Sequence, residues 1–359
     1  MGAVTQPARR TEEHWRLPGH GLQHAPLIRD EQPGAEPAAS WLRNPPGWGM
    51  RTLTSGYDRL PEGNVAQIRV GTLQYRIRPV TSFEAFEAQV AALVENAARG
   101  HCQLLVFPEY FTFQLLTLED AGRPMRERIR GLARQLPRYV EMFTRLASRY
   151  RLHIAGGTIA TSGPDESIHN DCYVFSPDGG HGVQGKLHLT RFEREVWGIR
   201  GRDRLQLFDT ALGKVAIAIC YDVEFPELAR AAALAGARVL VVPSCTDDRS
   251  GFLRVRGCAQ ARAIENQIFV IQSGTVGSLP GIPDFSFHYG QAAILTPCDA
   301  GFGWDGIRAD GVANEEMMVL GDLDMTALEE SRERGPVQPL FDSSQAPAAG
   351  YGPGAAIYL

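Results

Sequence analysis

The sequence lacks the features that mark membrane-spanning and nucleic-acid-binding proteins. No uninterrupted apolar stretch reaches the roughly 18 to 20 residues that cross a bilayer. The longest apolar stretches, such as VAIAIC and RVLVVP, have the length of a strand. The formal net charge is -5, so the chain has no surplus of Lys and Arg with which to neutralise phosphates. We therefore predict no membrane and no nucleic-acid partner.

Signatures of metal sites and disulfide frameworks are also missing. The nine histidines form no ligand-spaced cluster, no glycine-rich phosphate loop follows a strand, and none of the six cysteines forms a CxxC pair. The cysteines stand apart at positions 102, 172, 220, 245, 258 and 298. We predict no metal, no organic cofactor and no disulfide framework, so each cysteine has to be judged alone.

The composition divides the chain into three parts. Residues 1–63 hold eight of the 23 prolines and show little periodicity, which predicts an N-terminal arm. Residues 64–330 are predicted to form the domain, and residues 331–359, rich in Pro, Gly, Ala and Ser, are predicted to form a tail. The start, MGAVTQ, has neither the apolar region of a secretion signal nor a myristoylation pattern. We expect a cytoplasmic protein.

Segments of strand and helix character alternate from residue 65 onwards. The strand-like segments are VAQIRVGTLQYRI, QLLVFPE, HIAGGTIA, DCYVFSP, KVAIAIC, RVLVVP, QIFVIQS, QAAILTP and MMVLGDLD. Helices are predicted from a capping box of Thr81 and Glu84 to Gly100, and near 124–149, 226–236 and 251–266. This alternation predicts an α/β fold. Because the strands have no polar face, we expect helix layers on both sides of the sheets.

Three strand-like segments lead to a reactive side chain. LLVFPE ends at Glu109, the loop after DCYVFSPDGG leads to Lys186, and KVAIAIC ends at Cys220. Functional groups in α/β folds gather at the carboxyl ends of strands, so we expect these three to meet. A thiol with an ordinary pKa near 8.5 is mostly protonated at neutral pH, and its attack on an amide carbon needs a base or a nearby cation. Glu109 supplies the base, and Lys186 supplies the cation.

These segments resemble the three signature blocks of the nitrilase, or carbon-nitrogen hydrolase, superfamily. The blocks are LLVFPEYF, KLHLTRFERE and ICYDVEFPEL, in that order. Further similarity in NDCYVFSPDG, VVPS and ARAIENQIFV extends the resemblance over residues 65–325. The resemblance implies a four-layer αββα sandwich, in which two sheets pack face to face between helices. It also implies a homodimer or a higher homo-oligomer.

The resemblance assigns a role to each reactive residue. It implies hydrolysis of a non-peptide C–N bond through a thioester on Cys220, with Glu109 as general base and then general acid. Lys186 and the backbone N–H of Tyr221 would stabilise the oxyanion.

Further pocket residues follow from the same blocks. The family commonly has a second glutamate near the lysine, for which Glu193 is the first candidate and Glu195 the second. Tyr110, Phe192 and Ser244 are expected to line the substrate pocket.

Several nearby residues have simpler interpretations. His188 suggests a Cys-His dyad with Cys220, but the resemblance gives it a structural place beside the lysine. Asp222, Glu224 and Glu227 are interpreted as caps or charges of the helix after Cys220. That polar turn and helix predict an exposed thiol whose anion is favoured by a helix N-terminus. The other five cysteines are interpreted as inert, with Cys245 bordering the expected pocket.

The residues after the nucleophile indicate the type of reaction. CYDVEFPE is similar to amidase-like branches of the superfamily, whereas nitrile-cleaving members typically have Trp and Glu there. We therefore predict a small-molecule amide substrate, hydrolysed to release ammonia or an amine. N-carbamyl compounds and nitriles are the alternative substrates. A soluble cysteine acyltransferase and a catalytically silent scaffold are the alternatives of another class.

Overall fold

The computed structural model of the protein describes residues 67–282, 285 and 287–345. The predicted arm, residues 1–63, and the tail beyond residue 345 lie outside the described residues.

Twelve strands form one mixed, continuous sheet. They are β1 (Gln67–Ile77), β2 (Leu104–Phe107), β3 (His153–Ser162), β4 (Ile168–Phe175), β5 (His181–Gly185), β6 (Leu207–Thr210), β7 (Gly213–Ile217), β8 (Val239–Ser244), β9 (Phe269–Gly277), β10 (Ala293–Leu295), β11 (Ile307–Asp310) and β12 (Met317–Asp324). The helices are α1 (Phe83–Arg99), α2 (Met125–Ala133), α3 (Leu136–Tyr150), α4 (Pro226–Leu234), α5 (Arg249–Asn266), α6 (Met325–Arg334) and α7 (Pro339–Ser344). Three short helical turns complete the described chain: η2 (Phe111–Leu118), η3 (Glu193–Trp197) and η4 (Cys220–Glu224).

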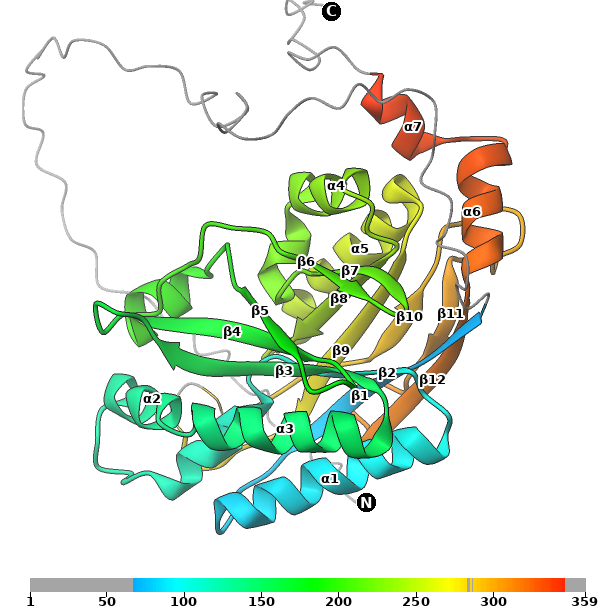
Figure 1. The fold of residues 1–359 in the computed structure, drawn as a ribbon. Coiled ribbons are helices and arrows are strands. Elements are labelled where there is room, and N and C mark those ends of the chain that lie inside the picture. Colours follow the sequence, from blue (N-terminus) through cyan, green and yellow to red (C-terminus); the bar gives the residue numbers. More distant parts are fainter. Residues whose placement is uncertain (1–66, 283–284, 286, 346–359) are drawn as a thin grey trace, which may run out of the picture. The chain divides into compact units, whose positions relative to one another are not determined.

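The sheet consists of two halves that meet at one short junction. One half runs β5-β4-β3-β2-β1 with β12 paired to β1, and the other runs β6-β7-β8-β9 with β10 and β11. The halves join where Gln74–Ile77 of β1 pair in parallel with Gly274–Gly277 of β9. Helices α1, α2 and α3 lie on the outer side of the first half, and α4 and α5 on the outer side of the second (Figure 1). The predicted α/β fold and four-layer αββα sandwich are confirmed.

Strand β2 shows why the sheets need a cover on both faces. Its side chains alternate: Leu104 and Val106 belong to the hydrophobic cluster that includes strands of the other half, while Leu105 and Phe107 pack in the cluster with α1 and α3. All four are buried. A strand with two apolar faces is stable only between two layers, and its carboxyl end therefore places Glu109 deep in the molecule.

Helix α1 forms where predicted, but with a different cap. Its buried residues Phe83, Phe86, Val90, Val94 and Ala97 recur at helical spacing and make one apolar face. The predicted capping box of Thr81 and Glu84 is wrong by one residue: the extended Ser82 is the N-cap, and its hydroxyl accepts a hydrogen bond from the backbone N–H of Ala85.

Other elements differ from the prediction in their extent. The helical stretch predicted near 124–149 is two helices, α2 and α3, and the short strands β5, β6 and β11 were not predicted. Helix α6 continues past residue 330 and α7 follows it, so the described part of the predicted tail is helical.

Candidate active site

Glu109 lies in a tight turn after β2. The next residue, Tyr110, has a left-handed backbone (φ 54°), and its N–H donates to the hydroxyl of Thr158 at 2.9 Å. Gly157 lies opposite: a Cβ there would come within 2.3 Å of the carbonyl oxygen of Pro108. The close approach of β3 to this turn thus requires glycine at position 157. The side chain of Glu109 lies inside the molecule and is 1% exposed.

Lys186 joins two glutamates from different segments. Its ammonium donates to Oε1 of Glu109 at 2.8 Å, and to Oε1 and Oε2 of Glu193 at 2.8 and 2.9 Å. Lys186 is 2% and Glu193 3% exposed. The structure therefore places Glu193 against the lysine, whereas Glu195 pairs with Arg191 on the surface.

The two glutamates share Lys186 and Asn170, whose Nδ2 lies 3.4 Å from Oε1 of Glu193, but they differ in their other donors. Glu193 also accepts hydrogen bonds from the hydroxyl of Tyr110 at 2.6 Å, and from the backbone N–H and the hydroxyl of Thr190, both at 2.9 Å. Glu109 accepts one further side-chain amide bond, from Asn170 Nδ2 at 2.8 Å. A carboxylate with more donors is better stabilised in its ionised form.

This difference separates the two pKa values. Burial raises the pKa of Glu109 to about 7, although the ammonium of Lys186 opposes the rise. Burial acts in the same direction on Glu193, but Lys186 and the hydrogen bonds of Tyr110 and Thr190 outweigh it, so its pKa lies below the ordinary value. The site therefore pairs one permanent anion with one acid that exchanges its proton near neutral pH.

Lys186 stays charged in this setting. Burial lowers its pKa, but the carboxylates of Glu109 and Glu193 outweigh burial and raise the pKa well above its ordinary value. An ammonium has three N–H donors. Its three acceptors are Oε1 of Glu109 and both carboxylate oxygens of Glu193, so the ammonium is held between the two acids.

Cys220 begins the turn η4 after β7. Its backbone is left-handed (φ 50°), a conformation that costs a residue with a side chain about 1 to 3 kcal/mol and is common at functional sites. The thiol donates to the carbonyl of Cys245 at 3.6 Å. The carboxylate of Glu109 and the ammonium of Lys186 both act electrostatically on this thiol, so the three groups lie near one another.

The prediction of an exposed, anion-favouring thiol is wrong. Cys220 is only 5% exposed, and the helix α4 begins at Pro226, after the short turn η4. Burial and the carboxylate of Glu109 raise the pKa of the thiol well above its ordinary value, and Lys186 does not offset them. Nucleophilic attack at this site therefore needs a base to remove the proton.

The residues predicted to line the pocket have different surroundings. Tyr110 is buried and directs its hydroxyl to Glu193. Phe192 is exposed and contacts the edge of Trp197, with ring centroids 5.1 Å apart. Ser244 is buried at the end of β8 beside Cys245, and the ring of Tyr221 packs on Phe225.

His188 does not form the Cys-His dyad with Cys220 that its sequence position suggested, and Cys245 contacts a different histidine. The imidazole of His188 stacks on Phe225 with centroids 3.6 Å apart, and its Nδ1 lies 3.0 Å from Asp222. The thiol of Cys245 lies 3.5 Å from Nδ1 of His288, and burial raises its pKa. Neither imidazole has a hydrogen bond with Cys220 among the contacts of the described chain.

Two residues of this site were not singled out in the sequence, and a third was given another role. Asn170 and Thr190 donate to the glutamates, and Asp222, interpreted as a helix cap, accepts hydrogen bonds from the residues after Lys186. Asn170 and Thr190 lie inside or beside the signature blocks, but nothing in their residue type indicates these contacts.

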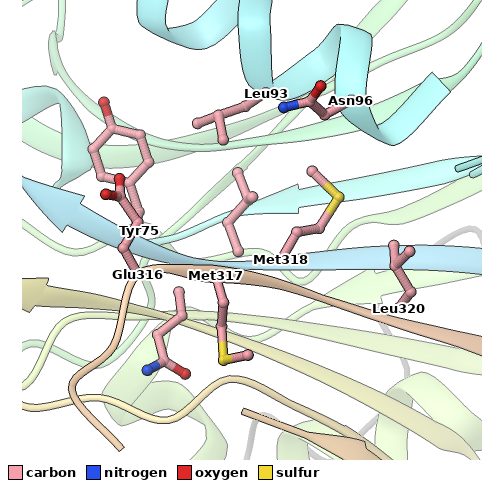
Figure 2. Close-up of a pocket in the computed structure, with 9 residues that line it drawn as sticks. Tyr75, Leu93, Asn96, Glu316, Met317, Met318 and Leu320 are labelled. Carbon is pink, nitrogen blue, oxygen red and sulfur yellow. The ribbon is translucent and has the colours of Figure 1, made fainter. Parts of the chain in front are cut away.

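One open space lies away from these residues. A cavity of about 390 Å³ lies between α1, β1 and β12, with Leu93 and Asn96 facing Met317 and Met318 (Figure 2). None of the residues that line it is Glu109, Lys186 or Cys220. We locate the site by the convergence of buried charged groups rather than by cavity size, because reactive groups with shifted pKa values mark chemistry more directly.

The described residues contain no group of three or more His, Cys, Asp and Glu side chains placed to hold a metal ion. No helix in this part of the chain is long and apolar enough to cross a membrane.

Comparison with known proteins finds one family in sequence and a matching fold in structure. The sequence model of the carbon-nitrogen hydrolases matches residues 69–330. The chain is 42% identical over 275 residues to a probable hydrolase, YhcX, of Bacillus subtilis, a match that covers 77% of this chain and 53% of that protein. The chain thus spans about half the length of that relative.

Two further relatives match over most of their length. The chain is 27% identical over 289 residues to omega-amidase NIT2-B of Xenopus laevis, covering 76% of this chain and 95% of that protein. The crystal structure of Nit3 from Saccharomyces cerevisiae, a member of branch 10 of the nitrilase superfamily, has the same fold, with a TM-score of 0.63 at 24% identity. That likeness covers 76% of this chain and 95% of Nit3.

Proposed function

Because this chain belongs to the carbon-nitrogen hydrolase family of the nitrilase superfamily, we propose that it hydrolyses the non-peptide C–N bond of a small-molecule amide through a thioester on Cys220. The observation that carries this proposal is the convergence of three buried groups from separate segments. The ammonium of Lys186 contacts the acid Glu109 at 2.8 Å, and both act electrostatically on the buried thiol of Cys220.

The first half of the reaction forms the thioester. Ionised Glu109 takes the proton of the Cys220 thiol as the sulfur attacks the amide carbon, and negative charge develops on the carbonyl oxygen. The ammonium of Lys186 and the backbone N–H of Tyr221 hold this oxyanion. Donors of this kind contribute about 3 to 4 kcal/mol each in comparable sites. Glu109 then gives its proton to the leaving nitrogen, the C–N bond breaks, and ammonia or an amine leaves.

The second half restores the thiol. Ionised Glu109 takes a proton from water, which attacks the thioester carbon, and Lys186 again holds the oxyanion. The C–S bond breaks, Glu109 returns the proton to the sulfur, and a carboxylic acid is released. A pKa of about 7 suits Glu109 to accept and donate at neutral pH.

The choice of an amide has its own support. The turn CYDVEFPE and the similarity to an omega-amidase of Xenopus laevis favour an amide over N-carbamyl compounds and nitriles. An acyltransferase would use the same thioester but pass it to an amine. Location in the cytoplasm and assembly into homo-oligomers stay predictions.

Ammonia release from a panel of amides, carbamyl amino acids and nitriles tests the proposal, with intact-protein mass measured in parallel. We expect ammonia from amides and a transient acyl mass on the wild-type protein. Cys220→Ala should abolish both, while Cys102→Ala, an equally buried thiol in the loop before β2, should keep both. Turnover by Cys220→Ala would refute the assignment, and acyl transfer to an added amine would favour the acyltransferase.

A further inference from the structure

We propose that Asp222 is a positioning residue that fixes the Lys186 segment against the Cys220 turn, and so sets where the ammonium stands relative to the sulfur. The inference rests on the proposed function, because it concerns the same site. It replaces the simpler interpretation of Asp222 as a helix cap.

The buried carboxylate of Asp222 accepts hydrogen bonds from two separate segments. Oδ1 accepts from the backbone N–H of His188 at 2.7 Å and contacts its Nδ1 at 3.0 Å. Oδ2 accepts from the backbone N–H of Leu187 at 3.2 Å and from that of Ile219 at 3.3 Å. Leu187 and His188 directly follow the lysine, and Ile219 directly precedes the nucleophile.

These contacts connect the two halves of the sheet. The backbone N–H of Lys186 donates to the carbonyl of Asn170 in β4, which belongs to the first half. The Cys220 turn is anchored to the second half, where Ala218 N–H donates to the carbonyl of Val241 in β8. Asp222 therefore bridges the lysine side and the thiol side of the site.

A helix cap would explain only part of this pattern. The bond from Ile219 N–H is local, and so is the bond that Asp222 N–H donates to the carbonyl of Ile219. The contacts with Leu187 and His188 reach a segment 35 and 34 positions away in the chain, and they include the shortest bond that Asp222 accepts.

The position of the ammonium matters because the oxyanion forms only in the transition state. A displacement of the order of 1 Å in a catalytic group can cost on the order of 100-fold in rate. A residue that sets this distance should affect kcat much more than KM, since it does not touch the ground-state substrate.

Asp222→Asn is the direct test, because Asn keeps the size of Asp but turns an NH₂ group towards backbone N–H donors. We expect kcat per titrated Cys220 thiol to fall on the order of 100-fold, with KM changed less than about three-fold. Asp222→Glu, which keeps the charge, should recover part of the loss. Asp324→Asn is the matched control: Asp324 also accepts from a backbone N–H, that of Ala327, but at the start of α6, and its kcat should stay at the wild-type value.

Hydrogen exchange gives a readout that does not depend on the substrate. In Asp222→Asn, the amides of Leu187, His188 and Ile219 should all exchange faster than in the wild type. If Asp222→Asn does not fold, Asp222→Glu provides the same two readouts with smaller effects. Faster exchange at Ile219 alone, or kcat within two-fold of wild type, would overturn the inference. If the wild-type protein turned over none of the amides, that result would instead count against the proposed function. The exchange measurement would still test whether Asp222 holds the segments of Lys186 and Cys220 together.

Discussion

The surroundings of Glu109 and Glu193 differ although both carboxylates are buried and bind the same ammonium. Glu193 accepts hydrogen bonds from the hydroxyl of Tyr110, from the backbone N–H and the hydroxyl of Thr190, and from Asn170 at 3.4 Å, whereas Glu109 accepts from Asn170 at 2.8 Å. The pKa of Glu193 is lowered, and that of Glu109 is raised to about 7. Burial raises both pKa values and the charge of Glu193 raises that of Glu109 further, so the additional donors around Glu193 separate the two acids.

Removing Lys186, the cation that both glutamates share, should have the largest effect on activity and stability. In Lys186→Ala the two buried carboxylates lose their common partner and the oxyanion loses a donor. We expect kcat to fall on the order of 100- to 1000-fold and the free energy of unfolding to fall by about 3 to 5 kcal/mol. Steady-state kinetics and urea unfolding measure the two effects. Lys214→Ala, the matched control in β7, should change neither, and an effect on KM alone would indicate uniform substrate binding.

Weakening the donor of Glu109 should shift its proton equilibrium. Asn170→Ala removes a hydrogen bond that favours the ionised carboxylate, so the pKa of Glu109 should rise further. A hydrogen bond to a charged group contributes about 1.5 to 3 kcal/mol, which corresponds to a shift of roughly 1 to 2 pH units. The rising limb of kcat/KM against pH should move up by that amount. A limb that stays in place would show that Asn170 does not control this acid.

Weakening one donor of Glu193 should have the smallest effect. Tyr110→Phe keeps the ring in its aromatic contacts but removes the hydroxyl, and Glu193 retains Lys186 and both donors of Thr190. We expect kcat to fall less than about ten-fold, with the pH limb unmoved. If the rise of kcat/KM with pH shifted as far as in Asn170→Ala, Glu109 and Glu193 could not be assigned different roles.

The sequence indicated Glu109 and Cys220 because each follows an apolar strand, and it indicated Lys186 through the resemblance of KLHLTRFERE to a family signature block. Buried strands such as β2 have a clear signal, and their carboxyl ends converge in this type of fold. A further signal is the scarcity of lysine: the chain has 36 basic residues, but the only lysines are Lys186 and Lys214. A compact ammonium, rather than a planar guanidinium, suits a point between two carboxylates and an oxyanion.

The rest depends on tertiary contacts that no local pattern contains. Asn170 and Asp222 have the residue types of turns and caps, and their roles come from segments that meet only in the folded chain. The burial of Cys220 was missed because the polar turn after it suggested exposure. Strands β5, β6 and β11 were missed because HGVQG, LFDT and IRAD are short and half-exposed, so they have little apolar signal.

The pH dependence of acylation of Cys220 tests the central claim most directly. Intact mass would follow acyl-enzyme formation from an amide in single turnovers between about pH 5 and pH 9. Glu109 must be ionised to take the thiol proton, so the rate should be low at acid pH and rise through a midpoint near its pKa of about 7. A midpoint near 4 to 5, typical of an ordinary carboxyl, or near 8 to 9, typical of a free thiol, would contradict the account.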